Sequence, residues 1–204
     1  ATTVKYGDVI EVKLYDPERN LNTTAKDKVT VSVSGATETS LTLTETDVNT
    51  GIFVADIIIG VNITGVNPGA SFSISYTDER SPKTPGTAKE FLTESYTLTY
   101  SVKSFVGSVK TDKTVYGPYE TVTIIINDWD ANRDPTQKDT ISKDKIFIVV
   151  GSIQIQPPSD AVETDVNTGV FEVEVTPDYL YTKATGETPS TLKEAAKYLL
   201  QAGN

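Results

Sequence analysis

The 204-residue sequence contains no cysteine, no histidine and no methionine. The absence of cysteine and histidine excludes a thiolate nucleophile, an imidazole general base and the usual zinc sites. What remains for metal binding is carboxylate, amide and carbonyl oxygen, which favours hard cations such as Ca²⁺. Without cysteine, a secreted form of the chain has no disulfides and must gain its stability in another way.

Clustered basic residues and long apolar runs are also lacking. Lys and Arg number 18 against 28 Asp and Glu, a net charge of -10, whereas phosphate recognition needs clustered cations. No apolar run approaches the roughly 20 residues of a membrane helix. We therefore expect no nucleic-acid partner and no membrane span. We interpret Ala1 as the first residue left after removal of a secretory signal, which predicts an extracellular or cell-surface location.

What the sequence does contain is an internal duplication. A ten-residue stretch at 45–54 recurs at 163–172 with eight of the ten positions identical. Each copy reads Glu-Thr-Asp-Val-Asn-Thr-Gly, then a β-branched residue and Phe. Such a repeat predicts two copies of one structural module. Since domains of about a hundred residues are common, we expect one domain at 1–104 and a second at 105–204.

Alternation of apolar and polar residues predicts short β-strands along most of the chain. In the first domain the predicted strands are 9–15, 29–34, 40–44, 53–59, 72–76 and 96–100. In the second they are 121–126, 145–150, 152–156 and 170–175. Many short strands separated by turn residues indicate β-sandwiches. The predicted fold class is all-β, with two tandem immunoglobulin-like β-sandwich domains and a short C-terminal helix.

The C-terminal helix is predicted from residue 191 onward. Apolar residues between 192 and 200 recur at helical spacing, Thr191 and Glu194 form a capping box, and Gly203 is a stop signal. Such a stripe caps a local core or binds a partner.

A second duplicated element, at 16–27 and 128–139, lies upstream of each ten-residue stretch. Oxygen-bearing residues recur at alternate positions and an acid stands at position 12, as in a calcium-binding loop. The candidate calcium ligands are Asp16, Glu18, Asn20 and Asp27 in the first loop and Asp128, Asp130, Asn132, Asp134 and Asp139 in the second. The loops are not EF-hands, because they lack Gly at position 6 and Glu at position 12 and are flanked by predicted strands. Alternatively, their Asp and Asn residues are turn formers.

The shared ten-residue stretch also has two interpretations. Its Asn-Thr-Gly supplies the residues that a tight strand connection needs. Glu45 and Asp47, with their counterparts Glu163 and Asp165, are either further metal ligands or solvated side chains. Paired carboxylates can perform glycoside hydrolysis, but these recur in both copies and duplicated active sites are rare in small sandwiches. We therefore expect no catalytic residues.

Two N-glycosylation sequons begin at Asn22 and Asn62, in or beside predicted loops. Both are candidate sites for N-linked glycans in a secreted protein. A sugar on Asn22 would crowd a cation in the first acidic loop, so these two interpretations compete.

The order of these motifs resembles the immunoglobulin-like repeat of archaeal cell-surface proteins. Such repeats occur in surface-layer proteins and in subunits of extracellular filaments and tubes, such as threads and cannulae. The residues that carry the resemblance are 6–8, 16–27 and 45–53, and again 116–118, 128–139 and 163–171. The resemblance implies a structural subunit outside the cell, often calcium-dependent and glycosylated.

The two copies differ outside the shared motifs. The first continues after its Gly-Ile-Phe strand with two further predicted strands that the second does not match, and the second has extra residues, 106–113, before its Tyr-Gly. A sandwich without a strand leaves an apolar groove and unpaired backbone groups, which a strand from another copy can fill. The candidate donor strand is Thr2, Thr3, Val4 and Lys5.

These observations predict a non-enzymatic extracellular structural subunit. Donor-strand contacts repeated head to tail build a filament, tube or surface lattice from copies of one chain, and calcium is the expected cofactor. In the alternative architecture the C-terminal helix covers the open edge of the second domain and the protein is a monomer. The alternative function is a monomeric calcium-dependent adhesion or carbohydrate-binding module, with Trp129 as its candidate aromatic contact.

Overall fold

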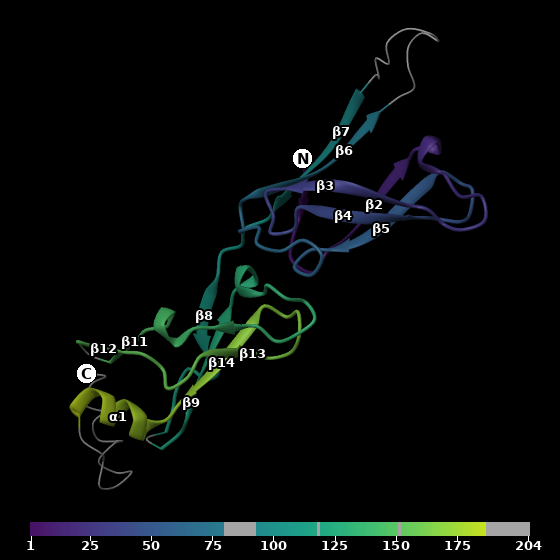
Figure 1. Cartoon of the computed structure of the whole chain (residues 1–204). Coiled ribbons are helices and arrows are strands. Elements are labelled where there is room, and N and C mark those ends of the chain that lie inside the picture. The colour runs from purple at the N-terminus through teal and green to yellow at the C-terminus, as the bar shows by residue number, and fades with distance from the viewer. Residues whose placement is uncertain (80–92, 118, 151, 187–204) are drawn as a thin grey trace, which may run out of the picture. The chain divides into compact units, whose positions relative to one another are not determined.

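The computed structural model describes residues 1–79, 93–117, 119–150 and 152–186 (Figure 1). Contacts divide the chain into two compact units, Ala1–Ser104 (unit 1) and Phe105–Asn204 (unit 2). The described residues form mostly β-strands with one short α-helix, which confirms the all-β class. The helix predicted from Thr191 lies outside the described residues.

Unit 1 forms one seven-stranded sheet in the order β1-β7-β6-β3-β4-β5-β2. Its strands are β1 (Thr2–Val4), β2 (Val9–Tyr15), β3 (Lys28–Ser34), β4 (Ser40–Glu45), β5 (Ile52–Ile58), β6 (Ser71–Glu79) and β7 (Thr93–Val102). All neighbours pair antiparallel except β1, which runs parallel to β7. A 3₁₀ turn, η1 (Pro17–Arg19), follows β2.

The sheet of unit 1 folds back on itself around a single apolar core. Its β4 pairs with β3 over five residues but with β5 only at Thr44 and Glu45, so the sheet bends there. Val12 of β2 and Phe72 of β6 belong to the same buried cluster, although their strands are far apart in the sheet order. The alternation of buried and exposed residues along β3 is the pattern of a strand with one face on a core.

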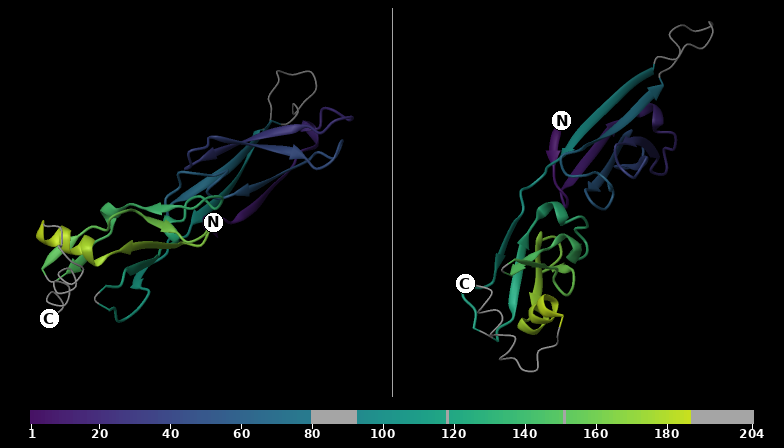
Figure 2. Two further views of the ribbon diagram at one scale, coloured as in Figure 1. Left: turned by 90° about the horizontal axis from the view of Figure 1, so that it is seen from below. Right: turned by 90° about the vertical axis from the view of Figure 1, so that its left-hand side faces the viewer.

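Unit 2 contains a five-stranded antiparallel sheet in the order β10-β13-β14-β9-β8 and a separate hairpin, β11-β12. The strands are β8 (Ser108–Thr111), β9 (Val122–Asn127), β10 (Thr140–Ile141), β11 (Ile148–Val150), β12 (Ile153–Ile155), β13 (Ala161–Glu163) and β14 (Val170–Val175). Two 3₁₀ turns, η2 (Trp129–Ala131) and η3 (Lys143–Lys145), connect them. The helix α1 (Pro177–Thr185) follows β14 and packs beside β12 (Figures 1 and 2).

Several elements of unit 2 differ from the sequence prediction, and the short strands β10 and β13 were not predicted. The strand predicted at 145–150 begins later, because Ser142 caps η3 and delays the extended backbone until Ile148. The helix α1 was not predicted, although Thr176 caps its first turn and Gly186 ends it at φ +77. Its apolar pattern is weak, and the residues of α1 that are buried are Pro177 and Leu180.

The duplicated part of the two units is a common framework. The strands β2 and β9 each run into an acidic loop, and each pairs with the strand that follows the Asn-Thr-Gly turn, β5 and β14. In the same way β4 and β13 lead into that turn. Around this framework the units differ: unit 1 adds β6, β7 and β1, whereas unit 2 adds β8, the β11-β12 hairpin and α1.

Candidate functional site

The first duplicated feature is a buried carboxylate that ties the acidic loop to the Asn-Thr-Gly turn. Glu45 is 2% exposed, and its Oε1 accepts hydrogen bonds from the backbone N–H groups of Thr50 and Gly51 at 2.6 and 2.7 Å. Its Oε2 accepts from the Asp27 N–H at 3.1 Å. Glu163, 1% exposed, makes the same three contacts, and the hydrogen-bond lengths are equal in the two units.

This carboxylate clip explains a residue that the sequence left with two interpretations. Burial raises the pKa of Glu45, but hydrogen bonds from Gly51, Asp27 and Thr50 outweigh burial, so the pKa lies below its ordinary value. The group is therefore ionised and satisfied within its own unit. Neither Glu45 nor Glu163 is a solvated side chain, and their contacts are those of structural anchors.

The turn that the clip holds has the same backbone in both units. Asn49 and Asn167 have φ of +61 and +58, and Gly51 and Gly169 both have φ of +64. An added Cβ on Gly51 would lie 2.8 Å from the Cα of Pro17, and on Gly169 it would lie 2.8 Å from the Trp129 ring. Glycine is thus required both for its conformation and for the close approach of the acidic loop.

In the first acidic loop the candidate ligands act as turn and cap acceptors. Asp16 is 5% exposed and caps η1, with its Oδ1 accepting from the Glu18 N–H at 3.0 Å. Asp27 Oδ2 accepts from the N–H groups of Leu21 and Asn22, both at 2.7 Å. The Asn20 amide donates to Asn49 Oδ1 at 2.8 Å and so links this loop to the duplicated turn.

The second acidic loop repeats these contacts. Asp128 caps η2, Asp139 Oδ2 accepts from two backbone N–H groups at 2.6 and 2.8 Å, and the Asn132 amide donates to Asn167 at 2.9 Å. Asp130 Oδ1 accepts from the Phe105 N–H at 2.9 Å. The Thr136 hydroxyl and N–H, and then Gln137, donate to Asp134 and lower its pKa.

The loops do not form a ready cation site. Among the described residues, no three acidic side chains come together in a group that could hold a metal ion. The remaining observation in favour of a cation is in the second loop: Asn132 is fully buried, and its Oδ1 has no hydrogen-bond partner. Asn20 Oδ1, its counterpart, is also buried without a hydrogen-bond partner, although the Asn20 residue is only partly buried. A free buried carbonyl oxygen is a ligand of the type that Ca²⁺ uses.

The remaining predicted residues are on the surface or packed locally. Asn22 and Asn62 are exposed, and each uses its Oδ1 to accept a nearby backbone N–H. Trp129 is half-buried: it packs against Gly169, and its ring lies 6.4 Å from that of Phe105. These contacts give Trp129 a packing role.

The candidate donor strand is paired within its own unit. Thr2 and Thr3 lie opposite Tyr100 and Ser101 of β7, and Val4, which is 4% exposed, lies opposite Val102. The Val4 carbonyl also accepts from the Lys103 N–H at 2.8 Å. This strand therefore completes the end of its own sheet.

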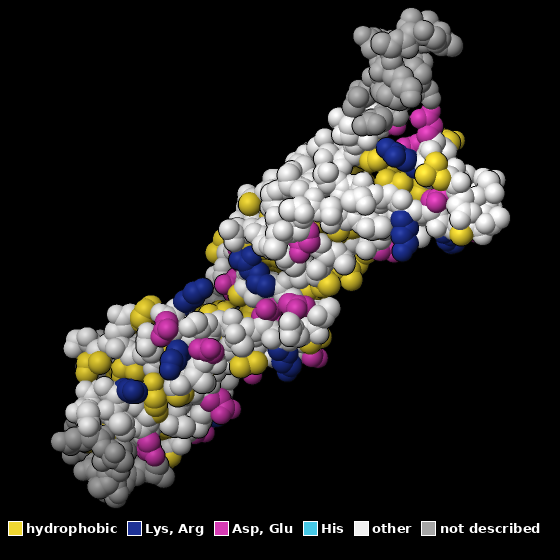
Figure 3. Space-filling view, viewed as in Figure 1, with side chains coloured by type: hydrophobic (Ala, Val, Ile, Leu, Met, Phe, Trp, Pro, Cys, Tyr) yellow, Lys and Arg dark blue, Asp and Glu magenta, His cyan; other side chains and the backbone are white. Residues whose placement is uncertain are grey.

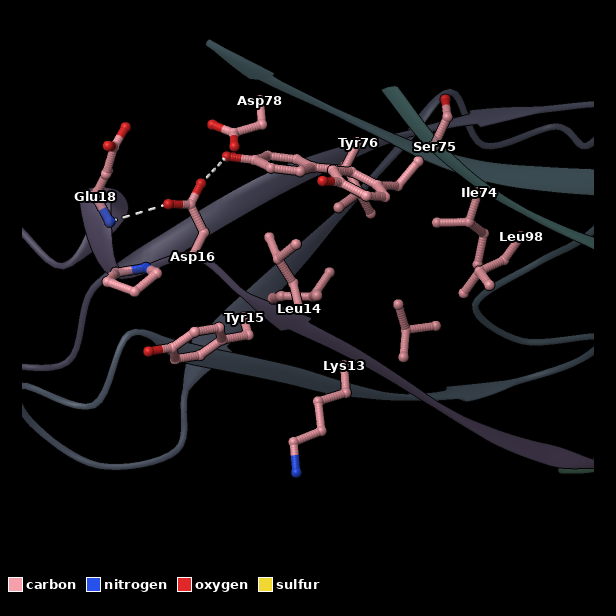
Figure 4. A pocket seen from close by; sticks show the side chains of 15 residues that line it. Lys13, Leu14, Tyr15, Asp16, Glu18, Ile74, Ser75, Tyr76, Asp78 and Leu98 are labelled. Carbon is pink, nitrogen blue, oxygen red and sulfur yellow. Dashed lines mark hydrogen bonds between the residues drawn. The ribbon is translucent and has the colours of Figure 1, made fainter. Parts of the chain in front are cut away.

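A large apolar groove lies in unit 1, between the edge strand β2 and the strands β6 and β7. Its volume is about 710 Å³. Val12 and Leu14 line it from β2, and Ile74, Tyr76 and Leu98 line it from the opposite wall (Figure 4). The motif alignment predicts the missing strand in the second domain, whereas this opening is in the first.

One end of the groove is closed by a polar contact. The Tyr76 hydroxyl donates to Asp16 Oδ2 at 2.5 Å (Figure 4). The same hydroxyl accepts from Arg19 Nε at 3.1 Å. Burial and the hydrogen bond to Asp16 raise the pKa of Tyr76, and Arg19 partly offsets them. The hydroxyl is therefore neutral, and it fixes η1 against β6.

Sequence reasoning missed the carboxylate clip and the groove for different reasons. The clip had a signal, because Glu45 precedes Thr50-Gly51 by the same spacing as Glu163 precedes Thr168-Gly169. The groove had none, since it depends on how far two sheet edges stand apart.

No family model matches this sequence, and no curated protein matches it. In the described part of the chain, no helix is both long and apolar enough to cross a membrane.

Proposed function

We propose that this chain is a non-enzymatic structural subunit that assembles head to tail with other copies of itself outside the cell, as a filament, tube or surface lattice. The observation that carries the proposal is the apolar groove of unit 1, which runs beside the edge strand β2. The two units are proposed to be immunoglobulin-like sandwiches, in keeping with the resemblance to archaeal surface repeats.

The groove supports assembly because it combines apolar side chains with a strand, β2, whose outer edge is unpaired in the described residues. Val9 and Tyr15 of β2 are 61% and 70% exposed, and Tyr96 and Leu98 across the groove are 50% and 48% exposed. Exposed hydrophobic side chains also form bands between acidic and basic ones on the face shown in Figure 3. Proteins normally protect such strand edges, and an open apolar edge favours addition of another strand.

The N-terminal strand remains the proposed donor. Because Thr2–Val4 already pairs with β7 of its own unit, donation would be an exchange, in which the same pairing forms between two copies. Such swapping changes few contacts and links copies in series when each chain both gives and receives a strand.

Calcium is proposed as a stabiliser of the second acidic loop. In the second loop Asn132 Oδ1 would be a ligand, together with carboxylate oxygens that turn hydrogen bonds leave free, such as Asp139 Oδ1. The ion would offset the mutual repulsion of the acidic side chains. N-linked glycans are proposed on Asn22 and Asn62, which are both exposed.

Light scattering of the purified protein tests assembly. We expect the mean particle mass to rise with protein concentration, to rise further when Ca²⁺ is added, and to fall again with a chelator. A monodisperse monomer under all of these conditions would overturn the proposed function. If assembly is unaffected by both Ca²⁺ and chelator, the calcium part of the proposal is wrong and the structural role stands.

A further inference from the structure

The duplicated framework shows what β2 lacks. In unit 2, β8 pairs antiparallel with β9 and covers its edge, with Ser108 opposite Asn127 and Thr111 opposite Ile124. In unit 1 the equivalent strand β2 ends the sheet, and no described strand pairs with its outer edge. The groove of about 710 Å³ opens along this edge.

The strand β8 is itself incompletely covered. It ends the sheet of unit 2, and all four of its residues are exposed. Val109 lies opposite Ile126, which packs against the core, yet Val109 is 69% exposed. Val106, just before β8, is 100% exposed. A valine on the core side of an edge strand that stays exposed indicates that a neighbour completes this face.

We propose that β8 of one copy pairs antiparallel with β2 of a second copy, so that the sheet of unit 2 continues into the sheet of unit 1 of the next chain. The inference rests on the proposed function and names the surfaces through which the copies meet. It places Val109 over the groove, on the same side as the inward-facing Val12 of β2.

Charge decides the register of this pairing. If β8 met β2 as it meets β9, Lys110 would oppose Lys13, which is unfavourable. A shift of two residues keeps every side chain on its face and places Lys110 opposite Glu11 and Val109 opposite Val12. It also brings the exposed Val106 opposite the exposed Tyr15. A parallel pairing with Val109 opposite Val12 restores the Lys110–Lys13 conflict, so the antiparallel one is preferred.

Each of the two strands has one charged side chain that is free to form this ion pair. Glu11 and Lys110 are exposed, and neither has an ion pair or a side-chain hydrogen bond within the described residues. The contact joins different surfaces of the two copies, so a joined pair still has one free β2 edge and one free β8 edge. Contacts of this heterologous type grow into open assemblies.

Disulfide trapping tests the contact cleanly, because the natural chain has no cysteine. Tyr15→Cys and Val106→Cys are made in separate chains of different tag length, mixed under assembly conditions and oxidised. Both positions are exposed, so the changes leave the cores intact. We expect a mixed covalent dimer that reductant reverses.

Two control pairs represent the other occupants of this edge. Tyr15→Cys is mixed with Thr2→Cys for the N-terminal strand, and with Val149→Cys, 71% exposed, for the β11-β12 hairpin. We expect at least about tenfold less mixed dimer with either control. If the chains assemble but Thr2 or Val149 crosslinks as well as Val106, this inference is wrong and the proposed function stands. If the unmodified protein never assembles, both fail.

A charge exchange supplies a second readout. Glu11→Lys and Lys110→Glu alone should each weaken association about threefold to tenfold, because a like-charge pair replaces an attractive one. The double variant should return to within about twofold of the natural protein. Failure of the double variant to recover, with both singles folded by circular dichroism, overturns the register.

Discussion

Units 1 and 2 share one device and differ in nearly everything built around it. Each has a buried glutamate, an acidic loop and an Asn-Thr-Gly turn with matching hydrogen bonds. In each unit the strand after this turn, β5 or β14, contributes a buried phenylalanine to the core. The strands beyond that framework are not shared. The comparison shows that the duplicated sequence preserves a folding module, while the edges of the two sheets diverged.

The largest effect is expected when the clip is removed. Glu45→Gln and Glu163→Gln replace an acceptor of several buried N–H groups by an amide, half of which donates. Each variant should lower the melting temperature of its own unit by about 5 to 15 °C. Trp129 is the only tryptophan and lies in unit 2, so its fluorescence follows that unit, whereas hydrogen exchange follows both.

The exposed Asp56→Asn of β5 and Glu172→Gln of β14 are the matched controls in the two units and should leave both transitions unchanged. If Glu45→Gln and Glu163→Gln behaved like these controls, the clip would have no structural role.

The duplicated turn allows a second comparison. Gly51→Ala places a Cβ against the Pro17 backbone, whereas Gly169→Ala places it against the Trp129 ring. With φ near +64, each should cost about 2 kcal/mol or more, and Gly51→Ala should cost more because backbone cannot rotate away. Gly169→Ala should also shift the Trp129 emission. Gly69→Ala, at φ +83 with open space around the added Cβ, isolates the conformational cost of about 1 kcal/mol.

Acid should weaken unit 1 through the clip. The pKa of Glu45 is lowered in the folded state, so its contribution is present above the ordinary value of 4.5 and is lost as pH falls below it. Glu45→Gln should therefore flatten the fall in unit 1 stability between pH 6 and pH 3, measured by hydrogen exchange. The pKa of Glu38 is also lowered, so Glu38→Gln should remove a separate part of the acid-induced loss of stability. An unchanged acid profile in Glu45→Gln would contradict the assignment.

Sequence reasoning succeeded where side-chain alternation is strict and failed where structure depends on distant contacts. The patterns of Val29–Ser34 and Ser40–Thr44 predicted β3 and β4 with small errors at their ends. The two-residue β10 carries too little pattern to be recognised. The acidic loops were seen, but their rhythm of oxygen atoms fits a calcium loop and a hydrogen-bonded turn equally well. Only the position of each acceptor distinguishes the two.

The smallest effect on stability is expected from loss of the hydrogen bond between Tyr76 of β6 and Asp16. Unit 2 has no counterpart of β6 among its described residues. Tyr76→Phe removes the hydroxyl that donates to the buried Asp16 and should cost about 1 to 2 kcal/mol, seen as faster hydrogen exchange in unit 1 alone. Tyr179→Phe removes the exposed hydrogen bond from α1 to the Gln156 carbonyl and should cost less than about 0.5 kcal/mol. Equal losses would mean that the strands added around the shared framework stabilise both units alike. A larger loss of unfolding free energy for Tyr76→Phe would show that β6 anchors the first acidic loop and that the second acidic loop has no equivalent anchor among the described residues.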